Sequence, residues 1–88
     1  MVSKDVTIIN RLGLHARPAA LLVKTASRFA SEIFLRKGTL EVNSKSIMGV
    51  MMLAAEKGSK ITVITNGPDE ALALEAIVKV FETRFGEE

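Results

Sequence analysis

The sequence predicts an α+β fold, an open-faced β-sandwich in which a four-stranded antiparallel sheet is covered on one face by three helices. Three observations predict it: short segments with apolar residues at period two, longer segments with helical apolar spacing, and their order along the chain, βαββαβα. Right-handed crossovers from strand one to two and from three to four interleave two β–α–β units, which gives the strand order 1-4-2-3. At 88 residues, the chain is expected to form a single domain over residues 1–88.

The first strand is expected over residues 2–9, because apolar side chains alternate there. A loop over residues 10–13 leads into a helix over residues 16–29, on which Leu21 falls among cations on the outer face. The residues predicted to form the core-facing stripe of this helix are Ala19, Leu22, Val23, Ala26 and Phe29 or Ala30.

The middle of the chain predicts a hairpin followed by a short helix. Strands are expected over residues 32–37 and 40–43, joined by a tight turn at Gly38 and Thr39. The short helix is expected over residues 47–55, with Val50, Leu53 and Ala54 pointing inward. Its methionines are then left partly exposed, and such adaptable side chains favour a contact surface.

The last strand and helix complete the sheet and its cover. Residues 60–65 form the most β-branched run of the chain, which indicates a central strand. A helix is expected over residues 69–85, ended by Gly86. Its predicted core residues are Leu74, Ile77, Val78, Phe81 and Phe85. The residues expected on the open face of the sheet are Thr7, Phe34, Glu41 and Thr62.

Composition excludes several classes of site. The chain has no cysteine and one histidine, which rules out disulfides and argues against a protein-only zinc site, so neither a metal nor a cofactor is expected. A net charge of +2 and the absence of Tyr and Trp argue against nucleic-acid binding. No apolar run approaches ~18 residues and no leader segment is evident, so we expect no membrane insertion and a cytoplasmic protein.

The charges are unevenly distributed along the chain. Residues 6–31 contain cations and no acid, whereas the charged residues from Asp69 onward are mostly acidic. The cations of the first segment are Arg11, Arg17, Lys24 and Arg28. This basic segment surrounds His15 and predicts an acidic partner or an anionic group at that place.

His15 is expected where the first strand gives way to the first helix, and three interpretations of it are open. It can be a polar N-cap or satisfied surface histidine, a general acid–base, or a nucleophile that accepts a phosphoryl group. No Ser, Cys or paired carboxylate lies near it in sequence, which disfavours acid–base catalysis. A phosphoryl acceptor needs positioning and charge stabilisation, and the free N–H groups of a helix start together with Arg17 supply both.

The residue that caps this helix is left open by the sequence. With His15 as the N-cap, Pro18 falls in the first turn, where its missing N–H costs nothing. The N–H groups of Ala16 and Arg17 are then free for phosphoryl oxygens. Proline disfavours helical torsions at the preceding residue, so Arg17 can itself be the cap. Either version leaves an anion site beside the imidazole.

Ser46 is the second candidate site. It can be a plain N-cap of the short helix, a role for which Ser44 competes, or it can be a regulatory phosphorylation site. A phosphoserine at a helix start is tolerated by the helix dipole, so the fold should survive it. Its charge would lie beside the methionines and repel an acidic partner.

The segment over residues 13–19, Gly-Leu-His-Ala-Arg-Pro-Ala, resembles the active-site segment of the HPr family. These are the histidine-containing phosphocarriers of the phosphoenolpyruvate-dependent sugar phosphotransferase system, and the resemblance covers essentially the whole chain. It implies an HPr-like fold and a stoichiometric relay rather than an enzyme. In the family, His15 takes a phosphoryl group on Nδ1 from phosphorylated enzyme I and passes it to a histidine of a sugar-specific IIA domain, assisted by Arg17.

The segment over residues 43–51 is similar to the regulatory-serine segment of HPr proteins modified by HPr kinase/phosphorylase, which implies an ATP-dependent phosphorylation of Ser46. Enzyme I and IIA domains dock on the first two helices in this family, and the chain is expected to act as a monomer. The partner-binding residues that this implies are Ala20, Leu21, Lys24, Ile47, Met48 and Met51.

Two alternatives stay open at this point. One is a regulatory carrier like the nitrogen-branch paralogue of HPr, and the other is a small interaction module without phosphate chemistry. Met52 and Ala54 depart from the family pattern, in which a small polar residue and a glycine are common, and both could alter the partner face.

Overall fold

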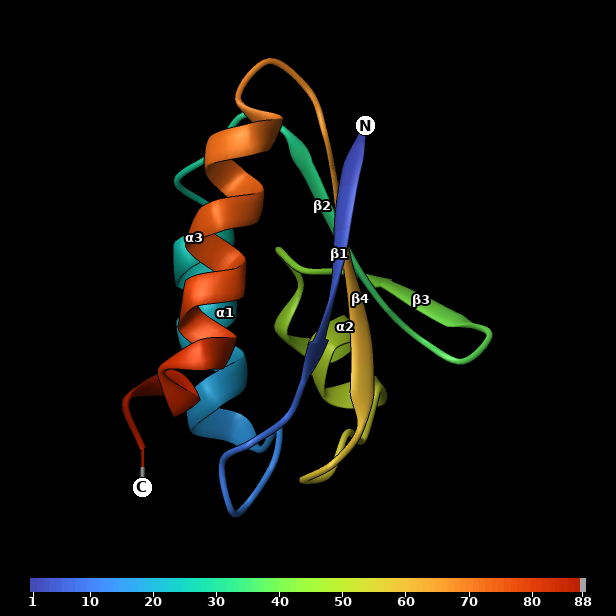
Figure 1. The fold of residues 1–88 in the computed structure, drawn as a ribbon, viewed down its shortest axis with the longest axis vertical. Helices are drawn as coiled ribbons and strands as arrows, with labels where there is room; N and C mark the ends of the chain where they lie inside the picture. The colour runs from blue at the N-terminus through green and yellow to red at the C-terminus, as the bar shows by residue number, and fades with distance from the viewer. Residues whose placement is uncertain (88) are drawn as a thin grey trace.

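The computed structural model describes residues 1–87 and has the element order that the sequence predicts (Figure 1). The elements are β1 (Val2–Thr7), α1 (Ala16–Ala26), β2 (Glu32–Lys37), β3 (Leu40–Asn43), α2 (Ile47–Met52), β4 (Lys60–Asn66), α3 (Glu70–Glu82) and the 3₁₀ turn η1 (Arg84–Gly86). The four strands form one sheet in the order β1-β4-β2-β3, with every neighbouring pair antiparallel. The predicted fold class and strand order are confirmed.

The helices form one layer against the sheet. Figure 1 shows α1 and α3 on the same side of the sheet, α3 in front of α1 in this view. The two helices contact each other, and α2 packs against α1 and β3. The core between the layers contains fully buried residues of both, such as Leu22 of α1, Ile77 of α3 and Ile33 of β2. The opposite face of the sheet is open, as predicted, and the residues predicted there are exposed or half-buried: Thr7, Phe34, Glu41 and Thr62. Ile64, which pairs with Phe34, is a buried residue of this face. In residues 1–87, no helix has the length and apolar character needed to cross a bilayer.

Each helix ends earlier than the sequence predicts. α1 ends at Ala26 rather than at residue 29, because the N–H groups of Arg28 and Phe29 bond to carbonyls three residues back, which tightens the last turn. The same happens at the end of α2, where Leu53 and Ala54 make such bonds after Met52. The expectation that Ala54 points inward is wrong, since the residue is exposed and has a φ of 46°.

The remaining boundaries differ for similar local reasons. β1 ends at Thr7 because Ile8 bonds to the turn at Gly58 and Ser59 instead of to β4. α3 ends at Glu82 because Arg84 and Phe85 adopt positive φ angles of 57° and 55°, which an α-helix cannot continue. Some predicted exposures also differ by degrees. Leu21 is predicted to be exposed, and Val23, Phe29 and Leu74 are predicted to face the core; all four are half-buried against it.

Candidate functional site

The loop between β1 and α1 is held firmly in the position from which His15 emerges. Gly13 has a φ of 70°, and a Cβ there would collide with the carbonyl oxygen of Ala55. The neighbouring Leu14 N–H donates to that same carbonyl at 2.9 Å. On the other side of the loop, the buried Asn10 donates from Nδ2 to the Gly13 carbonyl at 2.8 Å. Only glycine combines this torsion with so close an approach.

His15 is the N-cap of α1, which decides between the two caps that the sequence allows. Its backbone is extended, with φ −82° and ψ −172°, and its carbonyl accepts the N–H of Ala19 at 3.0 Å. The side chain makes no capping hydrogen bond, so the ring is not committed to the helix. It keeps 36% of its surface exposed and is open to an approaching molecule.

The start of α1 provides an anion site beside this ring. Pro18 lies in the first turn, and within residues 1–87 the N–H groups of Ala16 and Arg17 have no hydrogen-bond partner. Such free amides and the positive end of the helix dipole favour phosphate oxygens. Arg17 is exposed, and its guanidinium adds a donor fork suited to phosphate.

The structure brings Glu87 to His15, a contact that sequence reasoning missed. His15 Nε2 lies 3.0 Å from Oε2 and 3.1 Å from Oε1 of Glu87, 72 positions further along the chain. Asn10 Nδ2 donates to the same carboxylate at 3.1 Å. The uneven charge distribution is the signal in the sequence that could have found this contact, although by itself it predicts an external acidic partner or anion. Part of the counter-charge of the basic segment is Glu87 of the same chain.

Gly86 and Glu87 reach the site because Phe85 anchors the segment before them. Phe85 is buried and packs edge-on against Phe81 of α3, with ring centroids 4.9 Å apart. The 3₁₀ turn η1 then carries Gly86 and Glu87 across to the β1–α1 loop. This placement depends on packing of the core, which periodicity in the sequence does not reveal.

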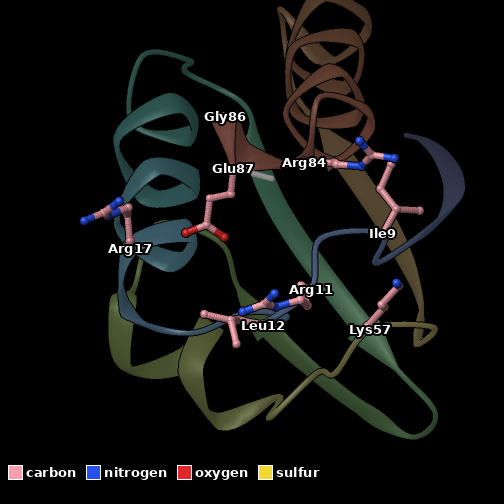
Figure 2. A pocket seen from close by; sticks show the side chains of 8 residues that line it. All are labelled: Ile9, Arg11, Leu12, Arg17, Lys57, Arg84, Gly86 and Glu87. Atoms are coloured by element: carbon pink, nitrogen blue, oxygen red, sulfur yellow. The ribbon is translucent and has the colours of Figure 1, made fainter.

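A basic pocket of about 810 Å³ opens beside the site. Figure 2 shows the Glu87 carboxylate turned toward the middle of this pocket, while the Arg17 side chain extends outward from α1. The cations that line it are Arg11, Arg17, Lys57 and Arg84. Such a surface attracts anions. In residues 1–87, no three His, Asp or Glu side chains gather so that they could hold a metal ion.

Ser46 is the N-cap of α2, and Ser44 is not. The Ser46 Oγ accepts the N–H of Gly49 at 3.2 Å, and the residue is exposed. Ser44 is fully buried instead, where its N–H pairs with the carbonyl of Ile33 at 2.8 Å. The hydroxyl of Ser46 is therefore accessible at the start of a helix.

The predicted partner residues lie on α1 and α2, two helices that contact each other. Met48 is 73% exposed, which matches the predicted methionine surface. The other exposed residues of the set are Ala20, Lys24, Ile47 and Met51, and Leu21 is half-buried among them.

Comparison with known proteins agrees with this arrangement. The family model described as "PTS HPr component phosphorylation site" matches residues 2–83. The phosphocarrier protein HPr of Treponema pallidum is 54% identical over 88 residues, 100% of both chains. The HPr-like protein Crh of Halalkalibacterium halodurans is 54% identical over 82 residues, 93% of this chain and 98% of that protein.

A solved structure shows the same likeness in three dimensions. HPr-C-His from Thermoanaerobacter tengcongensis superposes with a TM-score of 0.96 at 46% identity, covering 100% of this chain and 99% of that one. The heptapeptide around the only histidine, the strand order and these full-length matches agree with one another. The chain belongs to the HPr family, the phosphocarrier proteins of the phosphotransferase system.

Proposed function

We propose that His15 is the residue that carries the phosphoryl group, taking it from phosphorylated enzyme I and passing it to a histidine of sugar-specific IIA domains. The observation that carries this proposal is a half-exposed imidazole at the N-cap of α1, beside free backbone amides. The protein then turns over only between two enzymes and catalyses no reaction of its own.

The chemistry requires little beyond positioning and charge. A lone pair of the imidazole forms the N–P bond while the bond from phosphorus to the donor breaks, and the electron pair leaves with the donor. The N–H groups of Ala16 and Arg17 and the Arg17 guanidinium lie at the helix start, where they neutralise the phosphoryl oxygens. In transfer to the next protein, the acceptor histidine forms the new N–P bond, the bond from phosphorus to His15 breaks, and its electron pair returns to the His15 ring.

Incubation with enzyme I and phosphoenolpyruvate tests the proposal. An acid-labile phosphoryl group should appear on the wild-type protein, and His15→Ala should abolish it. Arg17→Ala should still be labelled, but more slowly, because the guanidinium stabilises charge without forming the bond. A wild-type protein that stays unlabelled would favour the alternative of an interaction module without phosphate chemistry.

The docking surface of this proposal combines α1 and α2 around His15. Ala20, Leu21 and Lys24 belong to the first helix, and Ile47, Met48 and Met51 to the second. Exposed methionines adapt to partners of different shape, which suits a carrier that must bind a donor and several acceptors in turn. The partners are enzyme I and IIA domains.

Ser46 is the regulatory site in this proposal, phosphorylated from ATP by an HPr kinase/phosphorylase. Support comes from its exposure and from a relative, Crh of Bacillus subtilis, described as the "catabolite repression HPr". The Ser46→Ala variant should take no phosphate from the kinase. Ser46→Asp should keep its fold, because a carboxylate also caps a helix, and should accept phosphate from enzyme I more slowly. Equal rates for Ser46→Asp and wild type would contradict this role.

The proposal also covers the branch of the phosphotransferase system, the oligomeric state and the cellular location. We place the protein in the sugar branch, in the cytoplasm and as a monomer; a regulatory nitrogen-branch role is the alternative. Its relatives include an HPr described as a dimer in Thermoanaerobacter tengcongensis. Light scattering over a range of concentrations tests the monomer, and transfer of phosphate to sugar-specific IIA domains tests the branch.

A further inference from the structure

The contact between Glu87 and His15 involves one particular nitrogen of the ring. Both carboxylate oxygens lie within 3.1 Å of Nε2, and the Glu87 side chain is only 17% exposed. A carboxylate accepts hydrogen bonds and donates none, so Nε2 carries the hydrogen in this contact. In the neutral ring, the lone pair is then on Nδ1.

The carboxylate is itself held in place. Asn10 is fully buried, and its Nδ2 donates both to Glu87 Oε1 at 3.1 Å and to the Gly13 carbonyl at 2.8 Å. The amide therefore ties Glu87 to the loop that ends at His15. A side chain fixed in this way orients its partner more strictly than an exposed ion pair does.

We propose that Glu87 is a positioning residue that fixes His15 in the Nε2–H tautomer and so makes Nδ1 the phosphoryl acceptor. The inference rests on the proposed function of His15 and assigns the choice of nitrogen to this chain's own C-terminal segment rather than to the enzyme that donates the phosphate. Glu87 touches neither the phosphorus nor the donor, and it acts only through the ring.

The same contact serves the phosphorylated ring. When the Nδ1 lone pair forms the N–P bond and Nε2 keeps its hydrogen, the ring gains a positive charge. The Glu87 carboxylate compensates this charge across the hydrogen bond. When the N–P bond later breaks, its electron pair returns to Nδ1, and the tautomer with hydrogen on Nε2 is restored without a proton transfer.

Phosphoramidate tests the choice of nitrogen without any partner protein. The Nδ1 lone pair attacks its phosphorus, the P–N bond of the reagent breaks, and the electron pair leaves with ammonia. On wild type, ³¹P and ¹⁵N NMR should find the phosphoryl group on Nδ1. On Glu87→Ala, Nε2 is uncovered, and the ratio of Nδ1 to Nε2 product should fall about tenfold, the order expected for loss of a charge-assisted hydrogen bond.

Glu82→Ala is the matched control, because Glu82 is an exposed acid near the same end of the chain. It should leave the product ratio unchanged. The unphosphorylated protein gives a second measurement: the Nε2 proton should be protected from exchange with water in wild type and in Glu82→Ala, and should lose this protection in Glu87→Ala.

The outcomes separate the two proposals. An unchanged product ratio and unchanged Nε2 protection in Glu87→Ala would overturn the role of Glu87, whatever enzyme I does. Failure of enzyme I to label wild type, together with the expected shift in the phosphoramidate products, would overturn the proposed function and leave the tautomer assignment standing.

Discussion

Three non-glycine residues adopt positive φ within the described chain, and one of them, Ala54, lies just after α2, a helix of the proposed docking surface. They are Ala54, Arg84 and Phe85, with φ values of 46°, 57° and 55°. The left-handed region costs a residue with a Cβ roughly 1–2 kcal/mol. At Phe85 the burial of its ring offsets this cost, and the torsion is what turns the chain toward His15. Ala54 is exposed and has no such compensation.

Ala54→Gly should therefore stabilise the protein. Glycine adopts this torsion freely but loses more backbone entropy on folding, so the net gain should be about 0.5–1 kcal/mol in the free energy of unfolding. Urea unfolding measures it. Ala20→Gly, in the exposed face of α1, is the control and should destabilise by about 1 kcal/mol. A loss of stability in Ala54→Gly would contradict the interpretation.

At the scale of elements, the start of α3 is joined to the turn before β2. The Asp69 carboxylate accepts the N–H groups of Ala30 and Ser31 at 3.0 and 2.9 Å, and also the Ser31 hydroxyl. The Asp69 N–H donates in return to the Ser31 Oγ at 3.1 Å. These bonds, with that of Ser31 first and that of Ala30 next, lower the pKa of Asp69 from its ordinary value of 3.8.

This lowered pKa predicts that the ionised Asp69 carboxylate stabilises the folded protein and that this contribution to the free energy of unfolding is lost in acid. A carboxyl whose pKa is lower in the folded state stabilises the protein above its unfolded pKa, and the contribution is lost as the pH falls through the lower, folded value. Wild type should thus lose stability as the pH falls below about 4, and Asp69→Asn should show a shallower dependence. Urea midpoints between pH 2 and 7 measure the slope. The exposed Glu75→Gln should keep the wild-type slope, and an equally shallow slope there would contradict the assignment to Asp69.

At the scale of the whole molecule, turns that are far apart in sequence meet at the ends of the sheet. Gly67, after β4, lies against Ser31, before β2, because the two strands are neighbours in the sheet. At the other end, the β1–α1 loop meets the segment after α2 through Gly13 and Ala55. At both ends the two backbone segments approach so closely that a Cβ on Gly67 or Gly13 would not fit.

Gly67→Ala should be strongly destabilising. A Cβ at Gly67 would lie 2.6 Å from the Cα of Ser31, so backbone must move. We expect a loss of about 2 kcal/mol or more in the free energy of unfolding relative to Gly38→Ala. Gly38, with a φ of 61° against 152° at Gly67, is the control for a positive-φ glycine in open space, because a Cβ added there would meet nothing within 4 Å. Equal losses in chemical denaturation would contradict the cost assigned to the contact between Gly67 and Ser31.

The partner face makes a prediction at the same scale. Lys24→Glu reverses a charge on the proposed docking surface and should slow phosphate transfer from enzyme I about tenfold at low salt, mainly through the association rate. Added salt should reduce the difference. Lys79→Glu, an exposed change of the same kind on α3, should transfer at nearly the wild-type rate. Rapid-quench transfer assays at several ionic strengths measure both, and equal slowing would place the surface elsewhere.

Much of the fold and part of the site could be predicted from the sequence, for local reasons. Alternation and helical spacing located all seven regular elements, and chain handedness supplied their order in the sheet. The boundaries were less accurate, because helix ends depend on hydrogen bonds such as those of Arg28 and Leu53, which have no marked sequence pattern. The sequence allows either Ser46 or Ser44 as the cap of α2, and only the burial of Ser44 in the structure chooses between the two serines.

The sequence by itself determined the fold class, the family and the place of the single histidine at the start of a helix. Each of these follows from neighbouring residues: periodicity, a glycine before the histidine, and a proline in the first turn. Only the tertiary structure decided which residues surround that histidine. Glu87 reaches His15 because Phe85 packs into the core, and the buried Asn10 of the β1–α1 loop holds the Glu87 carboxylate there. Contacts between residues so distant in sequence arise from packing of the whole chain, which no local pattern encodes.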